Sequence, residues 1–304
     1  MTSSPAELRV RPARPEDAEA VRELIAAFDK RHLGEADMTA DDLRDEWRRI
    51  DLERDSWIWE RNGAVVAHAT LTTWEALVDA DGYVHPDHTG AGLGTLILQT
   101  TEARARELGM PKLHNAVLAA DTDAARLLEA HGYRDVRHFY RMAIELEAPP
   151  LEPEWPEGLE PRPFEREHAR AFFASSQEAF ADEWNHMPEP FERFEGRRLA
   201  SPRFEPALWT AVWDREEIAA TLIADRERFG AGWIGSLSVR RLWRRQGLGL
   251  ALLRRSFGQF WEVGERRVQL GVDAQNPTGA TRLYERAGMH VVWEAVIYEK
   301  ELPP

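Results

Sequence analysis

The chain has 304 residues, enough for two domains with packed cores, and 43% of its residues are hydrophobic. It contains no cysteine, which excludes disulfides, thiolate metal sites and a cysteine nucleophile. The formal net charge of −14 argues against a general nucleic-acid binder. No stretch approaches the roughly 20 uncharged apolar residues of a membrane span, and the N-terminus lacks the apolar core of a signal peptide. We therefore expect a cytoplasmic protein that binds neither nucleic acid nor membranes.

The sequence divides into two similar halves. Each half opens with a short apolar segment, an Arg-Pro pair and a helical pattern, at residues 8–28 and 159–173. A proline-rich segment, residues 148–160, lies between them and is expected to form an extended linker. We therefore predict two domains, residues 1–147 and residues 161–304.

Two motifs occur in both halves. VHPDHTGAGLG at residues 84–94 aligns without gaps with VRRLWRRQGLG at residues 239–249, and an amphipathic helix pattern follows each. LLEAHGY at residues 127–133 aligns with LYERAGM at residues 283–289. A repeat of this length indicates a duplicated domain rather than a solenoid.

The second copy of the first motif has the composition of a phosphate site. Leu237–Val239 end an apolar segment typical of a buried strand, Arg240–Gln246 form a basic turn, and Gly247–Gly249 begin a helix. The N–H groups of a first helical turn attract anions, and glycine lets the backbone come close. Arginine adds bidentate contacts to phosphate oxygens. The glycines alone would equally indicate a tight turn.

The second motif of this half follows an alternating strand pattern at Val268–Val272. Asn276 and Pro277 are expected to begin a short helix, because asparagine caps helices and proline fits the first turn. Tyr284 lies on the apolar face of that helix, and Gly288 is a suitable terminator. Two plainer roles stay open, Asn276 as no more than a cap and Tyr284 as a core residue.

In this order and separation, the VxxxxRRQGLG turn and the NPTGAxxLYERAGM segment resemble the GNAT superfamily of acyl-CoA-dependent N-acyltransferases. The resemblance covers both halves, as in the mycothiol synthase-like two-domain proteins. It implies an α/β fold of two tandem GNAT-like domains, each a mixed twisted sheet flanked by helices. The implied function is an N-acetyltransferase that moves an acetyl group from acetyl-CoA to a primary amine of a small molecule or peptide. The reaction would be a direct attack that needs no metal.

The resemblance also implies roles for residues of the second half. Acetyl-CoA would bind along the strand end, the basic turn, the helix start and the second motif, at Leu237, Ser238, Val239, Arg244, Arg245, Gln246, Gly247, Leu248, Gly249, Leu250, Asn276 and Tyr284. Asn276 and Tyr284 would be the catalytic residues, with the Tyr284 phenol protonating the departing thiolate. The N–H of Val239 would polarise the thioester carbonyl. Of the four turn arginines, we expect two to touch phosphate and two to face water.

Two departures from the family pattern concern this half. The family often has a proline where Arg241 stands. The strand Trp233–Val239 contains no carboxylate, whereas many family members place a general base there. Candidates elsewhere in the half, none of them with a spacing argument, are Asp225, Glu227, Glu183 and His186.

The first half keeps the glycines of the turn but lacks the other groups. Thr89 replaces the first arginine of the RRQGLG segment, and Leu128 replaces the tyrosine. Ala120, next to Asp121, stands at the position of the asparagine. Because the thiolate acid is missing, we predict a degenerate, non-catalytic half, and whether it binds CoA stays open.

Two other functions stay open. Mycothiol synthase itself would acetylate a cysteinyl amine on a sugar-inositol. Alternatively, both halves could be non-catalytic acyl-CoA-binding modules of a sensor or scaffold. The acceptor depends on the stretch Phe180–Pro206 and on the final strands, where no motif is legible. The sequence is compatible with a monomer or a homodimer.

Overall fold

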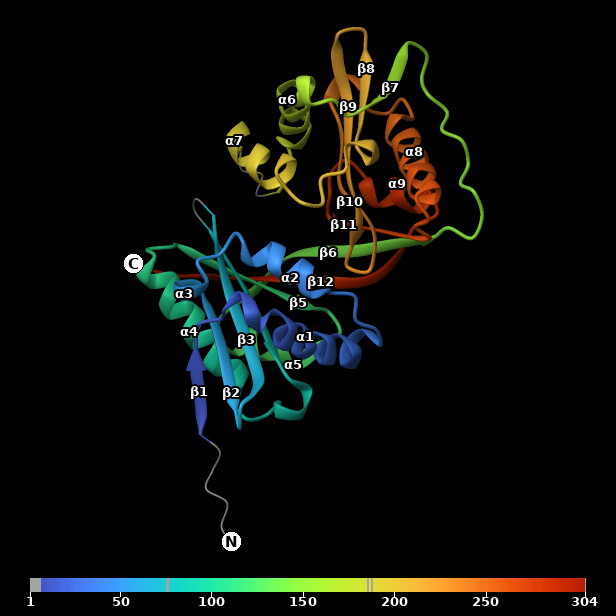
Figure 1. Ribbon diagram of the computed structural model, residues 1–304. Helices are drawn as coiled ribbons and strands as arrows, with labels where there is room; N and C mark the ends of the chain where they lie inside the picture. The colour runs from blue at the N-terminus through green and yellow to red at the C-terminus, as the bar shows by residue number, and fades with distance from the viewer. Residues whose placement is uncertain (1–6, 75–76, 185, 187, 304) are drawn as a thin grey trace. The chain divides into compact units, whose positions relative to one another are not determined.

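The computed structural model describes residues 7–74, 77–184, 186 and 188–303 (Figure 1). These residues form two compact units. The first unit is Met1–Phe139 with Trp293–Pro304, and the second unit is Tyr140–Val292. Each unit combines a sheet with flanking helices, which confirms the predicted α/β fold of two tandem domains.

The sheet of the first unit has the strand order β1-β2-β3-β4-β5-β12. Its strands are β1 (Leu8–Arg11), β2 (Ser56–Arg61), β3 (Ala64–Thr73), β4 (Val78–Val84), β5 (Lys112–Leu118) and, from Trp293 onwards, β12 (His290–Glu301). Its helices are α1 (Ala18–Leu33), α2 (Ala40–Trp47), α3 (Leu52–Asp55), α4 (Leu93–Glu107) and α5 (Thr122–Ala130), with 3-10 turns at Pro15–Asp17 and Pro86–His88. The β4–β5 pair is parallel, and the pairs β1–β2, β2–β3, β3–β4 and β5–β12 are antiparallel.

The sheet of the second unit has the strand order β6-β11-β10-β9-β8-β7. Its strands are β6 (Arg134–Glu145, from Tyr140), β7 (Leu159–Pro163), β8 (Thr210–Asp214), β9 (Glu217–Arg228), β10 (Ala231–Val239) and β11 (Arg267–Asp273). Its helices are α6 (Ala169–Phe180), α7 (Phe191–Phe194), α8 (Leu248–Glu262) and α9 (Ala280–Arg286), with short turns at Arg166–His168, Glu195–Leu199, Pro206–Leu208 and Arg241–Trp243. In Figure 1, α6 and α7 lie on one side of this sheet, and α8 and α9 on the other.

The last strand of each sequence half completes the sheet of the other unit. In the second unit, β6 lies beside β11, and the N–H of Leu146 donates to the carbonyl of Arg266 at 2.7 Å. In the first unit, β12 pairs with β5, with Tyr298 opposite Asn115. Such pairing satisfies backbone groups that an open sheet edge would leave exposed. The domain boundaries predicted from the sequence mark the ends of the two repeats, and they stay a prediction. The two packed units are divided differently, because each includes the last strand of the other half.

Helix α8 shows why the second half folds as it does around the glycine turn. Gly247 stands before the helix with φ 86°, a left-handed conformation that glycine adopts without a steric cost. The helix buries one face of apolar side chains, including Leu252, Phe257 and Phe260. That face packs on the sheet, where Gly232 leaves space for the Phe260 ring. The turn is therefore fixed between a central strand and a buried helix.

Candidate active site

Strands β10 and β11 pair in parallel over a short length only. Their register covers Gly232 and Trp233, and no pairing between them is found further along among the described residues. The N–H of Arg240 donates to the carbonyl of Ala219 in β9 at 3.0 Å. Because N–H groups alternate between the two edges of a strand, the N–H of Val239 points to the other edge, toward β11. Among the described residues, the N–H of Val239 has no backbone partner, and an exposed strand edge of this kind can bind an extended ligand.

A bulge interrupts β10 shortly before this end. The register with β9 shifts between Ile234 and Ser236, so Gly235 is the extra residue. The guanidinium of Arg198 lies against it, with Nη2 3.4 Å from the position that a Cβ on Gly235 would take. A side chain at position 235 would therefore contact the Arg198 guanidinium.

The three predicted residues of the strand end differ in burial. Ser238 is buried, and its hydroxyl lies 2.7 Å from that of Thr221 in β9. Leu237 and Val239 are half-buried on the alternate positions. The Ser238 side chain therefore serves the sheet, and contacts with a ligand would come from the backbone and from its two neighbours.

The turn after β10 presents a row of backbone donors. Among the described residues, no N–H of residues 245–249 donates to a backbone carbonyl, and the first bond of α8 runs from Leu250 to Gly247 at 3.1 Å. Arg245 has φ 62°, a left-handed conformation that is unfavourable for arginine, and the aligned residue of the first half is Gly90. Consecutive N–H groups at a helix start bind anions. The turn thus fits a pyrophosphate.

The remaining predicted residues of the turn lie around this row. Gln246 is exposed and donates from Nε2 to the carbonyl of Leu242 at 3.2 Å. Leu248 is buried in the core of the second unit. Gly249 and Leu250 are half-buried in the first turn of α8.

Three of the four turn arginines bind protein groups, which the sequence does not predict. Arg240 donates from Nε to Glu178 at 2.7 Å, and also contacts Glu217 at 3.0 Å. Arg241 donates from Nε to Asp182 at 2.8 Å. These contacts join the turn to α6 and the residues after it.

Arg244 completes this arrangement. Its Nε donates to the carbonyl of Val239 at 3.1 Å and its Nη2 to the carbonyl of Ala179 at 2.9 Å. We call the contacts of Arg240, Arg241 and Arg244 with residues 178–182 the arginine clamp. Complementary charge on the two segments was the available sequence signal for it. In the described part of the chain, Arg245 is the turn arginine for which no ion pair is found.

Tyr284 lies in α9 inside the core of the second unit and is only 8% exposed. Burial raises the pKa of its phenol above the ordinary value, and the negative charge of Glu183 raises it further. The phenol therefore keeps its proton at neutral pH and can act as a donor. Its burial confirms the plainer of its two roles, that of a core residue, and its catalytic role stays a prediction.

Asn276 brings a third element to Tyr284. Its Nδ2 donates to Oε1 of Glu183 at 3.2 Å. Burial raises the pKa of Glu183, and although the hydrogen bond from Asn276 acts in the opposite direction, the pKa lies above its ordinary value. This hydrogen bond thus joins the loop after α6 to the loop after β11, and the charge of Glu183 acts on the phenol of α9.

The prediction that Asn276 caps a helix was wrong. Helix α9 begins at Ala280, after Gly279 at φ 77°. The Asn276 side chain instead accepts from the N–H of Thr278 at 2.8 Å, which closes a local turn. The left-handed glycine stops the helix from reaching back to Pro277. This turn leaves the amide nitrogen of Asn276 available for Glu183.

The four candidate bases lie in different surroundings. Asp225 is buried, with Oδ2 3.6 Å from Nη1 of Arg198. Glu227 is exposed near the end of β9, and His186 is half-buried. Glu183 is the candidate whose carboxylate contacts Asn276.

The first unit has the same backbone arrangement as the candidate site but lacks its functional side chains. Strands β4 and β5 pair in parallel only at Val78–Ala80, and no N–H of residues 90–94 donates to a backbone carbonyl among the described residues. Leu128 is buried where the second unit has its tyrosine. Asp121 caps α5 by accepting from Ala124 at 3.0 Å. The first unit therefore has the backbone donors but no corresponding phenol.

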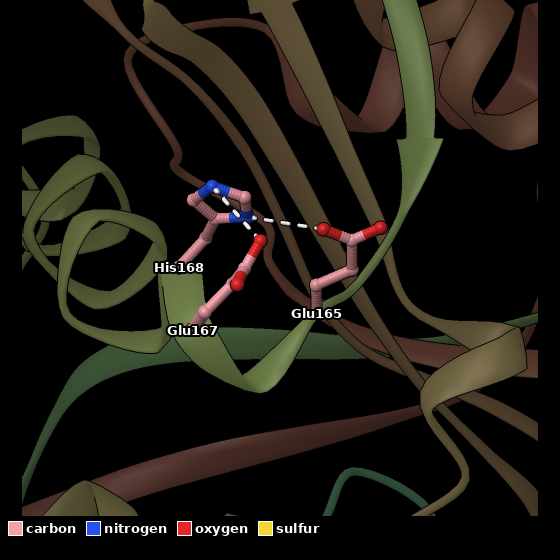
Figure 2. A group of neighbouring side chains, drawn as sticks. All are labelled: Glu165, Glu167 and His168. Carbon is pink, nitrogen blue, oxygen red and sulfur yellow. Dashed lines mark ion pairs between the residues drawn. The ribbon is translucent and has the colours of Figure 1, made fainter.

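One group of side chains has donor atoms close enough to hold a metal ion. Figure 2 shows Glu165, Glu167 and His168 at the turn before α6, with their nitrogen and carboxylate oxygen atoms within 4.8 Å of one another. Both glutamates are exposed, and the His168 ring lies against Trp213 at 4.9 Å between centroids. The group is local in sequence and separate from the residues around Tyr284. The expectation that the reaction needs no metal stays a prediction.

The sequence profile of the acetyltransferase (GNAT) family matches residues 19–133 and 172–289, once in each half. The chain belongs to the acetyltransferase (GNAT) family. This confirms the resemblance on which the sequence analysis rested, including its tandem form. Members of this family use acetyl-CoA as the acetyl donor.

Solved structures and curated relatives support the same assignment. A GCN5-related N-acetyltransferase from Sphaerobacter thermophilus is 38% identical, with a TM-score of 0.87 over 98% of this chain and 96% of that one. A mycothiol acetyltransferase from Thermobispora bispora is 32% identical over 67% of this GNAT chain and 70% of its own. A tandem GNAT protein from the clavulanic acid biosynthesis pathway shares the fold at 18% identity, with a TM-score of 0.76 over 98% of this chain and 99% of that one.

Within the described residues, no helix of this GNAT protein is both long enough and apolar enough to cross a bilayer.

Proposed function

We propose that the second unit is an acetyl-CoA-dependent N-acetyltransferase that acetylates a primary amine of a small molecule or peptide. The observation that carries the proposal is the buried phenol of Tyr284, in the unit that also carries the arginine turn and the hydrogen bond between Asn276 and Glu183. Family membership supports the reaction class. The first unit lacks the phenol and would be non-catalytic.

Different groups of the chain would bind different parts of acetyl-CoA. The N–H groups of residues 245–249 would hold the pyrophosphate, with the exposed Arg245 adding charge. The open edge of β10 would bond the pantetheine arm in the manner of an added strand, through Leu237 and Val239. The N–H of Val239, which points to this edge, would polarise the thioester carbonyl.

Acetyl-CoA supplies, when bound, a thioester that a neutral amine can attack directly. Tyr284 would then donate its proton to the departing thiolate, because its raised pKa keeps the phenol protonated at the pH of the reaction. Asn276 would orient the neighbouring Glu183 carboxylate through the hydrogen bond that its amide nitrogen donates. Much of the rate would come from holding amine and thioester together.

The test is release of the CoA thiol, followed with a thiol reagent in the presence of a panel of amino acids, amino sugars, polyamines and free peptide N-termini. We expect release that depends on the acceptor, and Tyr284→Phe should lower kcat by about 10²- to 10⁴-fold with acetyl-CoA affinity unchanged. If Tyr284→Phe releases CoA at the wild-type rate across pH, the phenol is not the acid. If acetyl-CoA binds but no amine is acetylated, a binding module is the better description.

A second acceptor is favoured by the relatives named mycothiol acetyltransferase. We propose it as the alternative because three such relatives are 27–32% identical over at least two thirds of this chain. The acceptor would then be the amine of a cysteinyl-glucosaminyl-inositol. The measurement is kcat/KM for this compound against the amine panel, together with rescue of a strain that lacks mycothiol synthase. A preference below about tenfold, equal to about 1.4 kcal/mol, would speak against it.

A further inference from the structure

We infer that Glu183 takes the proton of the acceptor amine, and that the arginine clamp holds Glu183 in place for this step. The inference rests on the proposed function, and it assigns the general base that β10 lacks. Strand β10 has no carboxylate between Ala231 and Val239. The carboxylate that reaches the site comes from the loop after α6 instead.

Position is the first support for this assignment. The Glu183 carboxylate accepts from Nδ2 of Asn276 at 3.2 Å, and its charge acts on the phenol of Tyr284. Both residues lie in the segment expected next to the thioester sulfur. A base must lie within hydrogen-bond reach of the amine that attacks the thioester. Glu183 is thus fixed by contact to Asn276, and its charge reaches the proton donor for the leaving group.

The electrostatic surroundings suit a base. Partial burial disfavours the charged form of Glu183, and the neighbouring charge of Asp273 acts in the same direction. Asn276 supplies one hydrogen bond that orients the carboxylate, and no ion pair of Glu183 is found among the described residues. A carboxylate with a raised proton affinity removes a proton from the attacking nitrogen more readily than an ordinary one.

The arginine clamp gives the loop a fixed position. Asp182, the residue before Glu183, is bound by Arg241, and the carbonyl of Ala179 is bound by Arg244. In the aligned turn of the first half, His85, Pro86 and Thr89 stand where the second half has the three clamp arginines. The clamp is therefore found in the half that also has Tyr284. This gives the three arginines a role through their contacts with residues 178–182.

The step balances as a group transfer. Glu183 takes one proton from the acceptor nitrogen, that nitrogen forms a bond to the acetyl carbon, and the carbon–sulfur bond breaks. Tyr284 gives its proton to the sulfur. The proton on Glu183 then restores Tyr284 or leaves to solvent, so the products are the N-acetylated amine and CoA with a free thiol.

The kinetic test compares Glu183→Gln with Glu183→Asp and with Glu192→Gln, a control at an exposed glutamate of α7. With the best amine of the panel, Glu183→Gln should lower kcat by about 10²-fold or more and remove the acidic limb of the pH–rate profile. Glu183→Asp should restore part of the rate, and Glu192→Gln should behave as wild type. Acetyl-CoA affinity, measured by calorimetry, should be unchanged in all three.

A second readout does not need an acceptor. In protein labelled with ¹³C at glutamate carboxyls, one resonance is absent from Glu183→Gln and identifies this side chain. It should titrate above the ordinary glutamate value and should shift when acetyl-CoA is added, whereas the Glu192 resonance should not. If no amine is acetylated by the wild type, the proposed function fails, and this resonance still reports on Glu183.

Three results would overturn the inference. One is a Glu183 resonance that ignores acetyl-CoA, which would place the carboxylate away from the thioester. Another is wild-type kcat in Glu183→Gln. The third is tighter acetyl-CoA binding in Glu183→Gln at constant kcat, which would mean that the carboxylate competes for Asn276 instead of serving the acceptor.

Discussion

A Cβ atom on Gly249 would lie 2.8 Å from Cδ2 of Leu283. The first turn of α8 therefore touches α9 where a larger residue does not fit. The first unit repeats this contact, because a Cβ on Gly94 would lie 2.8 Å from Cδ2 of Leu127. The last glycine of each turn thus serves helix packing in both units, whether or not the unit holds a ligand.

Gly249→Ala should destabilise the second unit through this contact. Overpacking costs about 1–3 kcal/mol, and the gain from replacing glycine is small at the helix start. The measurement is the free energy of unfolding in denaturant, alone and in a Leu283→Ala background. Removing the leucine side chain opens the space, so the same change should then be neutral or stabilising. Equal losses in both backgrounds would show that the contact with Leu283 is not the cause.

Gly258 supplies a matched control in the same helix. It lies inside α8, and a Cβ there would meet no atom within 4 Å. Gly258→Ala should therefore stabilise by about 0.5–1 kcal/mol, because alanine loses less conformational entropy in a helix. If the free energy of unfolding falls in Gly249→Ala and rises in Gly258→Ala, the effect of steric contact is separated from the effect of helix propensity.

Much of the fold could be predicted from the sequence, because the glycine turn and the second motif are local patterns that occur twice. The strand end at Val239, the left-handed Gly247 and the position of Tyr284 on the buried face of its helix follow from spacing and periodicity. The exchange of β6 and β12 could not be predicted, because the sequence pattern of a final strand is the same whichever sheet the strand joins.

The candidate site was harder to predict, since its groups meet only in three dimensions. The four arginines of the turn look like phosphate ligands in the sequence, yet three of them bind residues 178–182. The partner of Asn276 is Glu183, 93 residues away. Helix length was also misjudged, because Gly279 at φ 77° outweighs the capping preference of Asn276.

The arginine clamp predicts a dependence on salt. Arg241 and Asp182 are exposed, so their ion pair is screened by added salt. Arg241→Ala should leave the melting temperature nearly unchanged but lower kcat severalfold, since the loop that carries Glu183 loses a fixed point. Raising NaCl to about 1 M, where the screening length is about 3 Å, should lower wild-type kcat more than that of the variant. Equal salt dependence in both proteins would argue against the clamp.

Two buried histidines of the first unit should respond to pH with opposite signs. Burial alone would lower the pKa of His114, but its contacts with Asp79 and Glu299 raise it above the ordinary value. Burial lowers the pKa of His68 to about 4. His114 therefore stabilises the fold below about pH 6.5, and this contribution is lost as pH rises through the folded value. His68 stabilises above about pH 6.5, and its contribution is lost as pH falls toward 4.

The measurement for the histidines is the free energy of unfolding between pH 5 and 9 for His114→Asn and His68→Asn. Relative to wild type, the first variant should lose more stability at low pH than at high pH, because Glu299 of β12 loses a charged partner. The second should lose less at low pH. Parallel curves for wild type and the His114 variant would show that this imidazole does not link β5 and β12 by its charge.

Arg245 and Gly90 occupy the same position of the two turns, at φ 62° and φ 74°. Holding arginine there costs about 1 kcal/mol relative to glycine, so Arg245→Gly should raise the free energy of unfolding by about that amount. If the guanidinium binds the pyrophosphate, the same variant should weaken acetyl-CoA binding about tenfold, since a hydrogen bond to a charged group contributes about 1.5–3 kcal/mol. Denaturant unfolding of this variant thus tests the backbone strain at Arg245, and calorimetry tests the contact of its guanidinium with the pyrophosphate. A variant that is more stable and binds acetyl-CoA as tightly as wild type would leave the strain at Arg245 without a role in binding.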